Sequence, residues 1–225
     1  MQIVCILFPE FTQLDLTGPY EVFHRLPHAE VSLVAASADP VISEGGLAIL
    51  PTATFAEESA CDVLFVPGGP GVNDAMLDDE LIAFVRRHGE RAAFVTSACT
   101  GALVLGAAGL LAGFEAATHW ASMDYLQAFG AWPKKERVVV SGNRITGGGV
   151  TAGIDIALRI AEQTHGRAVA EAVQLAIEYD PHPPFNAGSP DTAPPEIRDA
   201  VLAKLAPLKE RRQRAVEEAA KKLSS

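Results

Sequence analysis

The chain has 225 residues, of which 48% are hydrophobic and 20% are charged. These proportions are ordinary for a globular protein and exclude a largely disordered chain. The 18 basic residues are outnumbered by 28 acidic ones, which gives a net charge of −10. Nucleic acids and anionic membranes bind to basic surfaces, so we expect neither as a partner. The length favours one domain with one sizeable core.

The first half of the chain alternates short apolar runs with helical patterns. We expect strands at 2–8, 31–37 and 63–69, and helices at 14–26 and 78–89. Thr17 is placed to cap the first helix, with Pro19 near its first turn, where a missing N–H is tolerated. Residues 41–55 carry weaker strand signals broken by glycine and proline, which predicts a small hairpin or excursion.

The second half continues the alternation. We expect a strand at 93–97, helices at 102–111 and near 120–130, strands around 137–146, and helices near 150–163 and 167–179. A Pro-rich loop (180–195) then precedes a charged helix at 196–223. This order of elements predicts a mostly parallel sheet covered by helices on both faces. We expect residues 1–195 to form one domain, with the helix of 196–225 packed on it or on a dimer partner.

One stretch of the chain has the length and the lack of charge that are typical of a membrane-spanning helix. Residues 92–114 carry no charge, and their number meets the length test for a spanning helix. The stretch also contains Thr96, Ser97, Thr100 and several glycines, and it changes midway from a strand pattern to a helix pattern. A buried strand joined to a buried helix is therefore the better interpretation.

The three cysteines, Cys5, Cys61 and Cys99, are too few and too scattered for a disulfide framework. Met1 leads straight into an apolar strand pattern without a basic start or a cleavage site, so we expect no signal peptide. The expected compartment is a reducing cytoplasm. Each cysteine must then be core filler or a reactive group.

Cys99 lies in SACTG (97–101), between an expected buried strand and the first turn of a helix. Such a turn, flanked by small residues such as Ala98 and Gly101, presents a nucleophile above a sheet. Because a helix N-terminus favours the thiolate, we expect a lowered thiol pKa, in the range of about 3.5–7.5. A buried structural cysteine is the alternative interpretation.

Two further strand ends should meet Cys99, since ligands bind beyond the carboxyl ends of parallel strands. In PGGPG (67–71), the N–H of Gly69, with that of Thr100, could stabilise negative charge on a substrate. The alternative is a tight turn without a ligand. Asp15, flanked by leucines after the first strand, is either a buried acid or base with a raised pKa or a helix-start residue.

The remaining candidates carry weaker signals. Cys5 lies mid-strand and Cys61 at a strand start, so both are expected to be filler. His119 follows the helix after Cys99 and could approach it as a supporting residue, although a packed structural histidine is an equal alternative. The chain has no CxxC, HExxH or GxxxxGK[ST] motif, so we expect no metal centre and no P-loop.

Several segments together resemble the ThiJ/PfpI superfamily of flavodoxin-like cysteine proteins, and within it the branch that hydrates isocyanides to N-formamides. They are FPEFTQLDLTGPYEVF, VPGGPGV, VTSACTGALVLGAAGLL, ATHWA, TGGGVTAGIDIAL and PPFNAGSPDTAP. The turn at Cys99 and the PGG turn are common to the superfamily. Asp15 within QLDLTGP and the NAGSPDTAP loop are more specific to this branch. The resemblance implies a flavodoxin-like three-layer sandwich.

The resemblance also implies a mechanism. Cys99 would attack the isocyanide carbon to form a thioimidate, Asp15 would manage protons for the substrate nitrogen and the attacking water, and Thr100 would support the site. No cofactor is implied; the partners are a small neutral isocyanide and water. The family is dimeric, and an apolar stripe on the last helix could pack against a second copy. That stripe consists of Ile197, Val201, Leu205 and Leu208.

Other functions on the same scaffold remain open. Related domains occur in AraC-type regulators, which suggests a non-catalytic ligand-binding role, but those proteins carry a DNA-binding region for which one helix after residue 195 is too little. A glutamine amidotransferase would need a His-x-Glu after the cysteine, and the His-x-Glu of this chain, His28–Glu30, precedes it. A hydrolase or glyoxalase-type activity is harder to exclude, because fold does not fix function.

Overall fold

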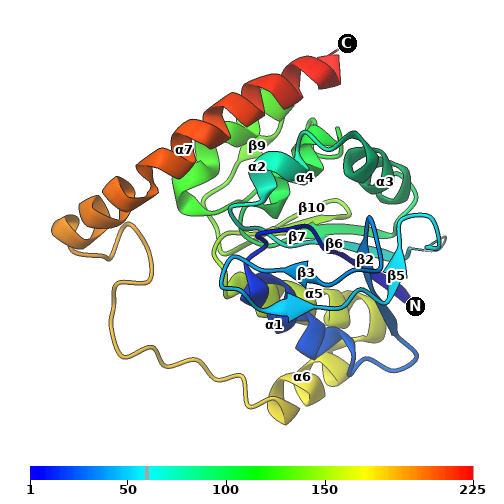
Figure 1. Ribbon diagram of the computed structural model, residues 1–225. Helices are drawn as coiled ribbons and strands as arrows, with labels where there is room; N and C mark the ends of the chain where they lie inside the picture. The colour runs from blue at the N-terminus through cyan, green and yellow to red at the C-terminus, as the bar shows by residue number, and fades with distance from the viewer. Residues whose placement is uncertain (59–60, 225) are drawn as a thin grey trace.

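The computed structural model describes residues 1–58 and 61–224, and its centre is a sheet (Figure 1). In the described chain this sheet has seven strands in the order β10-β11-β7-β6-β1-β2-β5. Every neighbouring pair is parallel except β10–β11, which is antiparallel. The strands are β1 (Gln2–Ile6), β2 (Glu30–Ala35), β5 (Ala53–Thr54), β6 (Val63–Val66), β7 (Phe94–Ser97), β10 (Val138–Ser141) and β11 (Arg144–Gly147).

Helices cover both faces of the sheet. On one face lie α1 (Gln13–Phe23), α5 (Ala152–His165) and α6 (Arg167–Ala176); on the other lie α2 (Val72–Ala75), α3 (Asp79–Gly89), α4 (Gly101–Ala107), the 3-10 helix η1 (Trp120–Phe129) and α7 (Pro195–Ser224) (Figure 1). The protein is therefore a three-layer α/β sandwich with a mostly parallel sheet, which confirms the predicted fold class.

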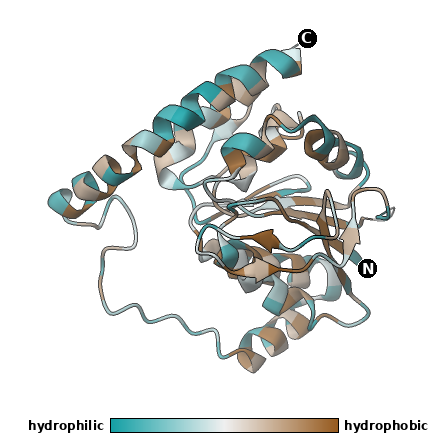
Figure 2. Cartoon of the chain, viewed as in Figure 1, coloured by the Kyte–Doolittle hydropathy of each residue, from teal (hydrophilic) through white to brown (hydrophobic). Residues whose placement is uncertain are grey.

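The hydrophobic patterns explain the central layer. The strands β1 and β6 lie between both helical layers, and apart from Gln2 their residues are buried. Strands covered on both faces read as continuous apolar runs, and the sheet is largely brown or pale in Figure 2. The uncharged stretch 92–114 forms β7 and α4, with the entire helix buried. No helix in the described ranges is long and apolar enough to cross a membrane.

Element ends differ from the prediction where tertiary contacts decide them. The helix α1 begins at Gln13 with Thr12 as its N-cap residue. The prediction that Thr17 caps this helix is therefore wrong. Thr17 lies inside the helix, where its hydroxyl donates to Gln13 Oε1 at 3.0 Å. The helix α4 ends at Ala107 rather than 111, because Gly109 adopts a positive φ of 79° that stops the helix.

The weaker predicted elements also have counterparts. Residues 41–55 contain a small antiparallel pair, β3 (Val41–Ile42) with β4 (Ala48–Ile49), before β5 joins the main sheet. The helix expected near 120–130 is 3-10 along its length. A two-residue strand, β8 (Glu115–Ala116), pairs with β9 (Trp132–Pro133) and ties the start of this region to its end.

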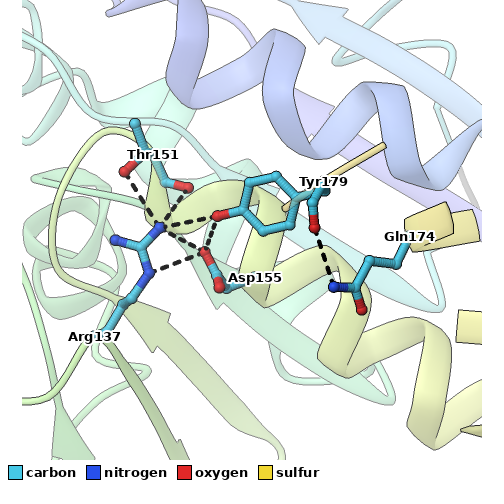
Figure 3. Close-up of polar contacts among 5 residues, drawn as sticks. All are labelled: Arg137, Thr151, Asp155, Gln174 and Tyr179. Atoms are coloured by element: carbon cyan, nitrogen blue, oxygen red, sulfur yellow. Dashed lines mark hydrogen bonds and ion pairs between the residues drawn. The ribbon is translucent and has the colours of Figure 1, made fainter. Parts of the chain in front are cut away.

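A polar network fixes the start of α5 (Figure 3). Arg137 donates to Asp155 Oδ2 through Nε (3.0 Å) and Nη2 (2.6 Å), and Nη2 also reaches the carbonyl oxygen of Thr151 (3.2 Å). The Tyr179 hydroxyl donates to the same Asp155 oxygen at 2.9 Å, and Gln174 donates to the Tyr179 carbonyl. The network joins the β10–β11 hairpin, α5 and the segment after α6.

The last helix reaches the domain through an extended loop. Residues 181–188 are exposed, and the loop runs outside the body before α7 returns across α2, α4 and η1 (Figure 1). The second half of α7 packs on the domain through Arg212, Ala215, Val216 and Ala219. The first half projects outward and alternates brown and teal in Figure 2. Residue 225 lies outside the described residues.

The apolar stripe on α7 divides in two. Ile197 and Val201 are 51% and 41% exposed. Leu205 and Leu208 instead line the cavity beside Cys99. The two halves of the stripe therefore differ, and packing of this stripe against a second copy stays a prediction.

Candidate active site

The site lies where three parallel strands end together. The strands β1, β6 and β7 are neighbours in the sheet, so their carboxyl ends meet at one edge. The chain turns away in opposite directions from β1, toward β2 on one side and β6 on the other, and such a reversal opens a crevice for ligands. The segments after these strands, residues 7–15, 67–71 and 98–101, meet there as expected.

Cys99 occupies a strained turn between β7 and α4. Its φ is +51°, a region that side chains other than glycine and asparagine rarely adopt. The turn closes tightly, because a Cβ at Gly101 would lie only 2.2 Å from the Val66 carbonyl oxygen. The Thr118 hydroxyl donates to the Cys99 carbonyl at 2.8 Å and stabilises the turn. The tight strand-to-helix turn predicted for Cys99 is present.

Asp15 lies beside this cysteine. Its side chain is fully buried, and its Oδ2 accepts the Gly68 backbone N–H at 2.8 Å. Gly68 is required here, since a Cβ would lie 2.5 Å from the Thr100 nitrogen and 2.8 Å from Asp15 Oδ2. Oδ1 accepts no hydrogen bond of good geometry from the described residues. The Asp15 carboxyl group and the Cys99 thiol influence each other's ionisation.

Burial controls the protonation of this pair. It raises the pKa of Asp15 to about 7, although the Gly68 N–H and the Cys99 side chain favour the carboxylate. Burial and the neighbouring Asp15 also raise the pKa of the Cys99 thiol above its ordinary value, against the lowering influence of the Thr100 N–H and Arg212. The predicted lowering of the thiol pKa is therefore wrong for this arrangement. The helix N-terminus stabilises the Cys99 thiolate by less than desolvation destabilises it.

The two backbone donors named from the sequence differ in availability. The Gly69 N–H donates to Thr100 Oγ1 at 3.0 Å, inside the protein. The Thr100 N–H instead interacts with the Cys99 sulfur. Thr100 thus links the cysteine turn to the PGG turn, and its N–H is the donor that faces the Cys99 sulfur.

A cavity of about 150 Å³ opens onto Cys99. Its walls come from seven separated parts of the chain, and they are Thr12, Glu44, Gly69, Pro70, Cys99, Thr100, His119, Ala121, Ser122, Val150, Leu205, Leu208, Lys209 and Arg212. His119 reaches the cavity, as considered from the sequence. Its Nδ1 accepts the Ala121 N–H at 3.3 Å, and burial followed by Arg212 lowers the pKa of the ring, which favours neutral imidazole.

The other cysteines lie away from this cavity. Cys5 is fully buried in β1, and Cys61 lies just before β6, at the opposite end of the sheet from Cys99. Burial raises the pKa of the Cys5 thiol and raises that of Cys61 to about 12, which favours the protonated thiol at both positions. In residues 1–58 and 61–224, no group of three or more His, Cys, Asp or Glu side chains is placed to hold a metal ion.

Arg212 is the site residue that sequence analysis missed. It comes from α7, is 5% exposed, and lines the cavity with Cys99. Its guanidinium donates to Asn73 Oδ1, Ser122 Oγ and the Gly69 carbonyl at 2.9, 3.1 and 3.2 Å. The spacing of Leu208, Ala215 and Ala219 around it was a usable signal, because it places Arg212 on the buried face of the helix.

The sequence and the fold are similar to those of known proteins. The chain is 50% identical to an isonitrile hydratase of Pseudomonas putida over 100% of its own length and 98% of that protein. A ThiJ/PfpI family protein from Pseudomonas syringae has a similar structure, with a TM-score of 0.93, 46% identity, and coverage of 96% of this chain and 90% of that one. The transcriptional regulator GbdR of Pseudomonas aeruginosa is 26% identical over 78% of this chain but only 50% of the regulator.

The family assignment rests on a match over most of the domain. The model of the DJ-1/PfpI family matches residues 1–163, a range that holds the sheet, the cysteine turn and Asp15 but not α7. The fold, the turn at Cys99 and the full-length relatives agree with this match. The chain therefore belongs to the DJ-1/PfpI family.

Proposed function

We propose that this protein is an isocyanide hydratase, a hydro-lyase that adds water to a small organic isocyanide and releases the N-formamide. The observation that carries the proposal is the buried pair of Cys99 and Asp15, of which Cys99 lines a small cavity. The identity of 50% to an isonitrile hydratase over the whole chain supports it, since isonitrile and isocyanide are the same functional group.

In the first half-reaction, the Cys99 sulfur bonds to the terminal carbon of R–N≡C. The thiol proton passes to Asp15 and from there to the same carbon, which gives the thioimidate R–N=CH–S–Cys. An acid whose pKa is about 7 suits this exchange, because proton transfer is most effective when the pKa lies near the working pH. The Thr100 N–H stabilises the sulfur as it gains negative charge.

In the second half-reaction, water adds to the thioimidate carbon. Asp15 takes a proton from the water while the nitrogen gains one, so the adduct is R–NH–CH(OH)–S–Cys. Its collapse breaks the C–S bond, returns a proton to the sulfur and releases R–NH–CHO. One isocyanide and one water are consumed and Cys99 is regenerated, so the cycle needs no cofactor. Covalent catalysis thereby divides one difficult addition into two easier steps.

The cavity suits a compact and uncharged substrate. Its volume of about 150 Å³ admits a small alkyl or aryl group, and Pro70, Val150, Leu205 and Leu208 give it apolar walls. An isocyanide has no net charge, so the net charge of −10 does not repel it. We assign His119 a supporting role, because its ring already bonds the backbone of Ala121.

We also infer a cytoplasmic homodimer that needs neither nucleic acid nor a membrane. The exposed Ile197 and Val201 on the projecting half of α7 offer an apolar surface to a second copy. Sedimentation at micromolar concentration should give a mass near twice 23.8 kDa. A monomer at that concentration would remove the dimer from the proposal.

The competing proposal is a ligand-binding domain, which the similarity to GbdR supports. The decisive experiment incubates purified protein with an alkyl and an aryl isocyanide and follows formamide by mass spectrometry. We expect catalytic turnover by the wild type, none by Cys99→Ala, and full turnover by Cys61→Ala as the matched control. Binding without turnover in the wild type would favour the ligand-binding role. Undiminished turnover by Cys99→Ala would reject Cys99 as nucleophile.

A further inference from the structure

Arg212 is a buried cation without an ionic partner in the described structure. It reaches the site from α7 and bonds the Gly69 carbonyl across 143 positions of sequence. Its three acceptors, on Asn73, Ser122 and Gly69, are neutral oxygens. No ion pair joins its guanidinium to a carboxylate anywhere in residues 1–58 and 61–224, although the surface offers many such pairs, including Arg211 with Asp74 at 3.7 Å.

Such an arrangement is costly, since removing a charge from water is only partly repaid by neutral hydrogen bonds. An apolar residue would cover the domain at lower cost, as Ala215 and Val216 do one turn later. A cation maintained at that cost favours any negative charge that forms beside it. The group beside it that becomes negative during the proposed reaction is Cys99, which lines the same cavity.

We propose that Arg212 is a positioning residue whose charge stabilises the negative form of Cys99, so that α7 completes the reactive site. The inference deepens the proposed function and rests on Cys99 as its nucleophile. It also assigns α7 a role that the family match over residues 1–163 does not cover. The side-chain hydrogen bonds hold the guanidinium in one orientation, so its charge is fixed before substrate arrives.

Other charged and titratable groups lie around Cys99 and its cavity. Asp15 opposes ionisation of Cys99, whereas Arg212 and the Thr100 N–H favour it. Glu44 raises the pKa of Asp15 slightly, after the larger influences of burial, Gly68 and Cys99. His119, with its lowered pKa, is neutral near pH 7. The remaining cation at the wall is Lys209.

A purely structural role for Arg212 makes a different prediction. Its bonds to η1, α2 and the PGG turn also anchor α7. If anchoring were its only contribution, loss of the charge would loosen α7, expose Cys99 and make the thiol more accessible. If the charge acts on the sulfur, its loss makes the thiol less reactive at neutral pH.

The test measures alkylation of Cys99 by iodoacetamide between pH 5 and 10, with the Cys99 peptide quantified by mass spectrometry. The variants are Arg212→Lys, which keeps the charge, and Arg212→Gln, which keeps hydrogen-bond donors without it. Arg211→Gln is the matched control, because Arg211 is the exposed neighbour on the same helix. Lys209→Gln tests the other cation of the wall. No isocyanide is used, so absent hydratase activity would reject the proposed function without touching this result.

We expect Arg212→Gln to alkylate Cys99 at least tenfold more slowly at pH 7 than Arg212→Lys, with its pH midpoint moved upward by at least one unit. Arg212→Lys should stay within threefold of the wild type, and Arg211→Gln should match it. Equal rates for the lysine and glutamine variants, or faster alkylation in the glutamine variant, would overturn the proposal. If Arg212→Gln does not fold, Arg212→Met is compared with Arg212→Lys under the same criteria.

Discussion

Gly68 donates its backbone N–H to Oδ2 of Asp15 at 2.8 Å, across 53 positions of sequence. The bond ties the turn after β6 to the first turn of α1, and it fixes the carboxyl group that faces Cys99. Because a Cβ at Gly68 would meet both the Thr100 nitrogen and Asp15, the contact requires glycine and has no space to relax.

Gly68→Ala should therefore damage stability and activity together. We expect a loss of about 1–3 kcal/mol in unfolding free energy from overpacking, and at least a hundredfold loss of formamide formation, because Asp15 is displaced. Gly188→Ala is the control, since a Cβ there has no neighbour within 4 Å. Chemical denaturation and turnover check both effects. A fully active Gly68→Ala protein would contradict the importance of this contact.

Asp15 should make stability depend on pH. The unfolded chain releases this proton near pH 4, whereas the folded protein holds it until about pH 7. The stability that protonated Asp15 contributes is therefore complete below pH 4 and is lost as the pH rises to 7. Relative to Asp15→Asn, the wild type should lose about 4 kcal/mol across this interval. Urea denaturation at several pH values measures the difference, and a constant difference would show that Asp15 titrates normally.

Activity should follow the same ionisation. In the proposed mechanism the Asp15 carboxylate accepts the thiol proton, so kcat/KM should rise with pH and level off above an inflection near 7. Asp15→Asn should reduce turnover by about 10²–10⁴-fold and remove that inflection. If the pH profile of Asp15→Asn keeps the inflection, a group other than Asp15 is responsible for it.

Leu208 should set the size of the accepted substrate. It lines the same cavity as Cys99, and one added or lost methylene in such a pocket changes selectivity by about 10–200-fold. Leu208→Ala should improve kcat/KM for a bulky aryl isocyanide relative to methyl isocyanide, and Leu208→Phe should do the reverse. Leu175→Ala, at a position that is 81% exposed, should leave the ratio unchanged. Equal changes in kcat/KM for both isocyanides would show that the substituent of the substrate does not contact Leu208.

Tyr179→Phe should weaken the network of Figure 3 without removing the catalytic groups. The hydroxyl bonds Asp155 at 2.9 Å, and the net value of such a bond is about 0.5–1.5 kcal/mol. We expect a decrease of that size in unfolding free energy by denaturant titration, with alkylation of Cys99 unchanged. A change in the alkylation rate would show that the network also governs the cavity.

The sequence predicts those features that local pattern determines. Buried strands carry apolar runs, so the sheet can be predicted from short segments. Cys99 lies between such a strand and small residues, and this local pattern predicts its tight turn. The position of Arg212 does not, because the exposed loop before α7 carries no pattern that specifies where the helix docks. The direction of the Cys99 pKa is also a tertiary property. It depends on burial and on Asp15, whereas the sequence reveals only the helix terminus.

The projecting loop and late helix have a consequence for how the protein is made. Ribosomes release residues in order and domains fold as they emerge, so Cys99 and Asp15 leave the ribosome well before Arg212. On the assignment of Arg212 proposed above, the newly made sulfur lacks its stabilising cation until α7 docks. Stabilisation of the negative form of Cys99 by Arg212 therefore begins only with the finished fold.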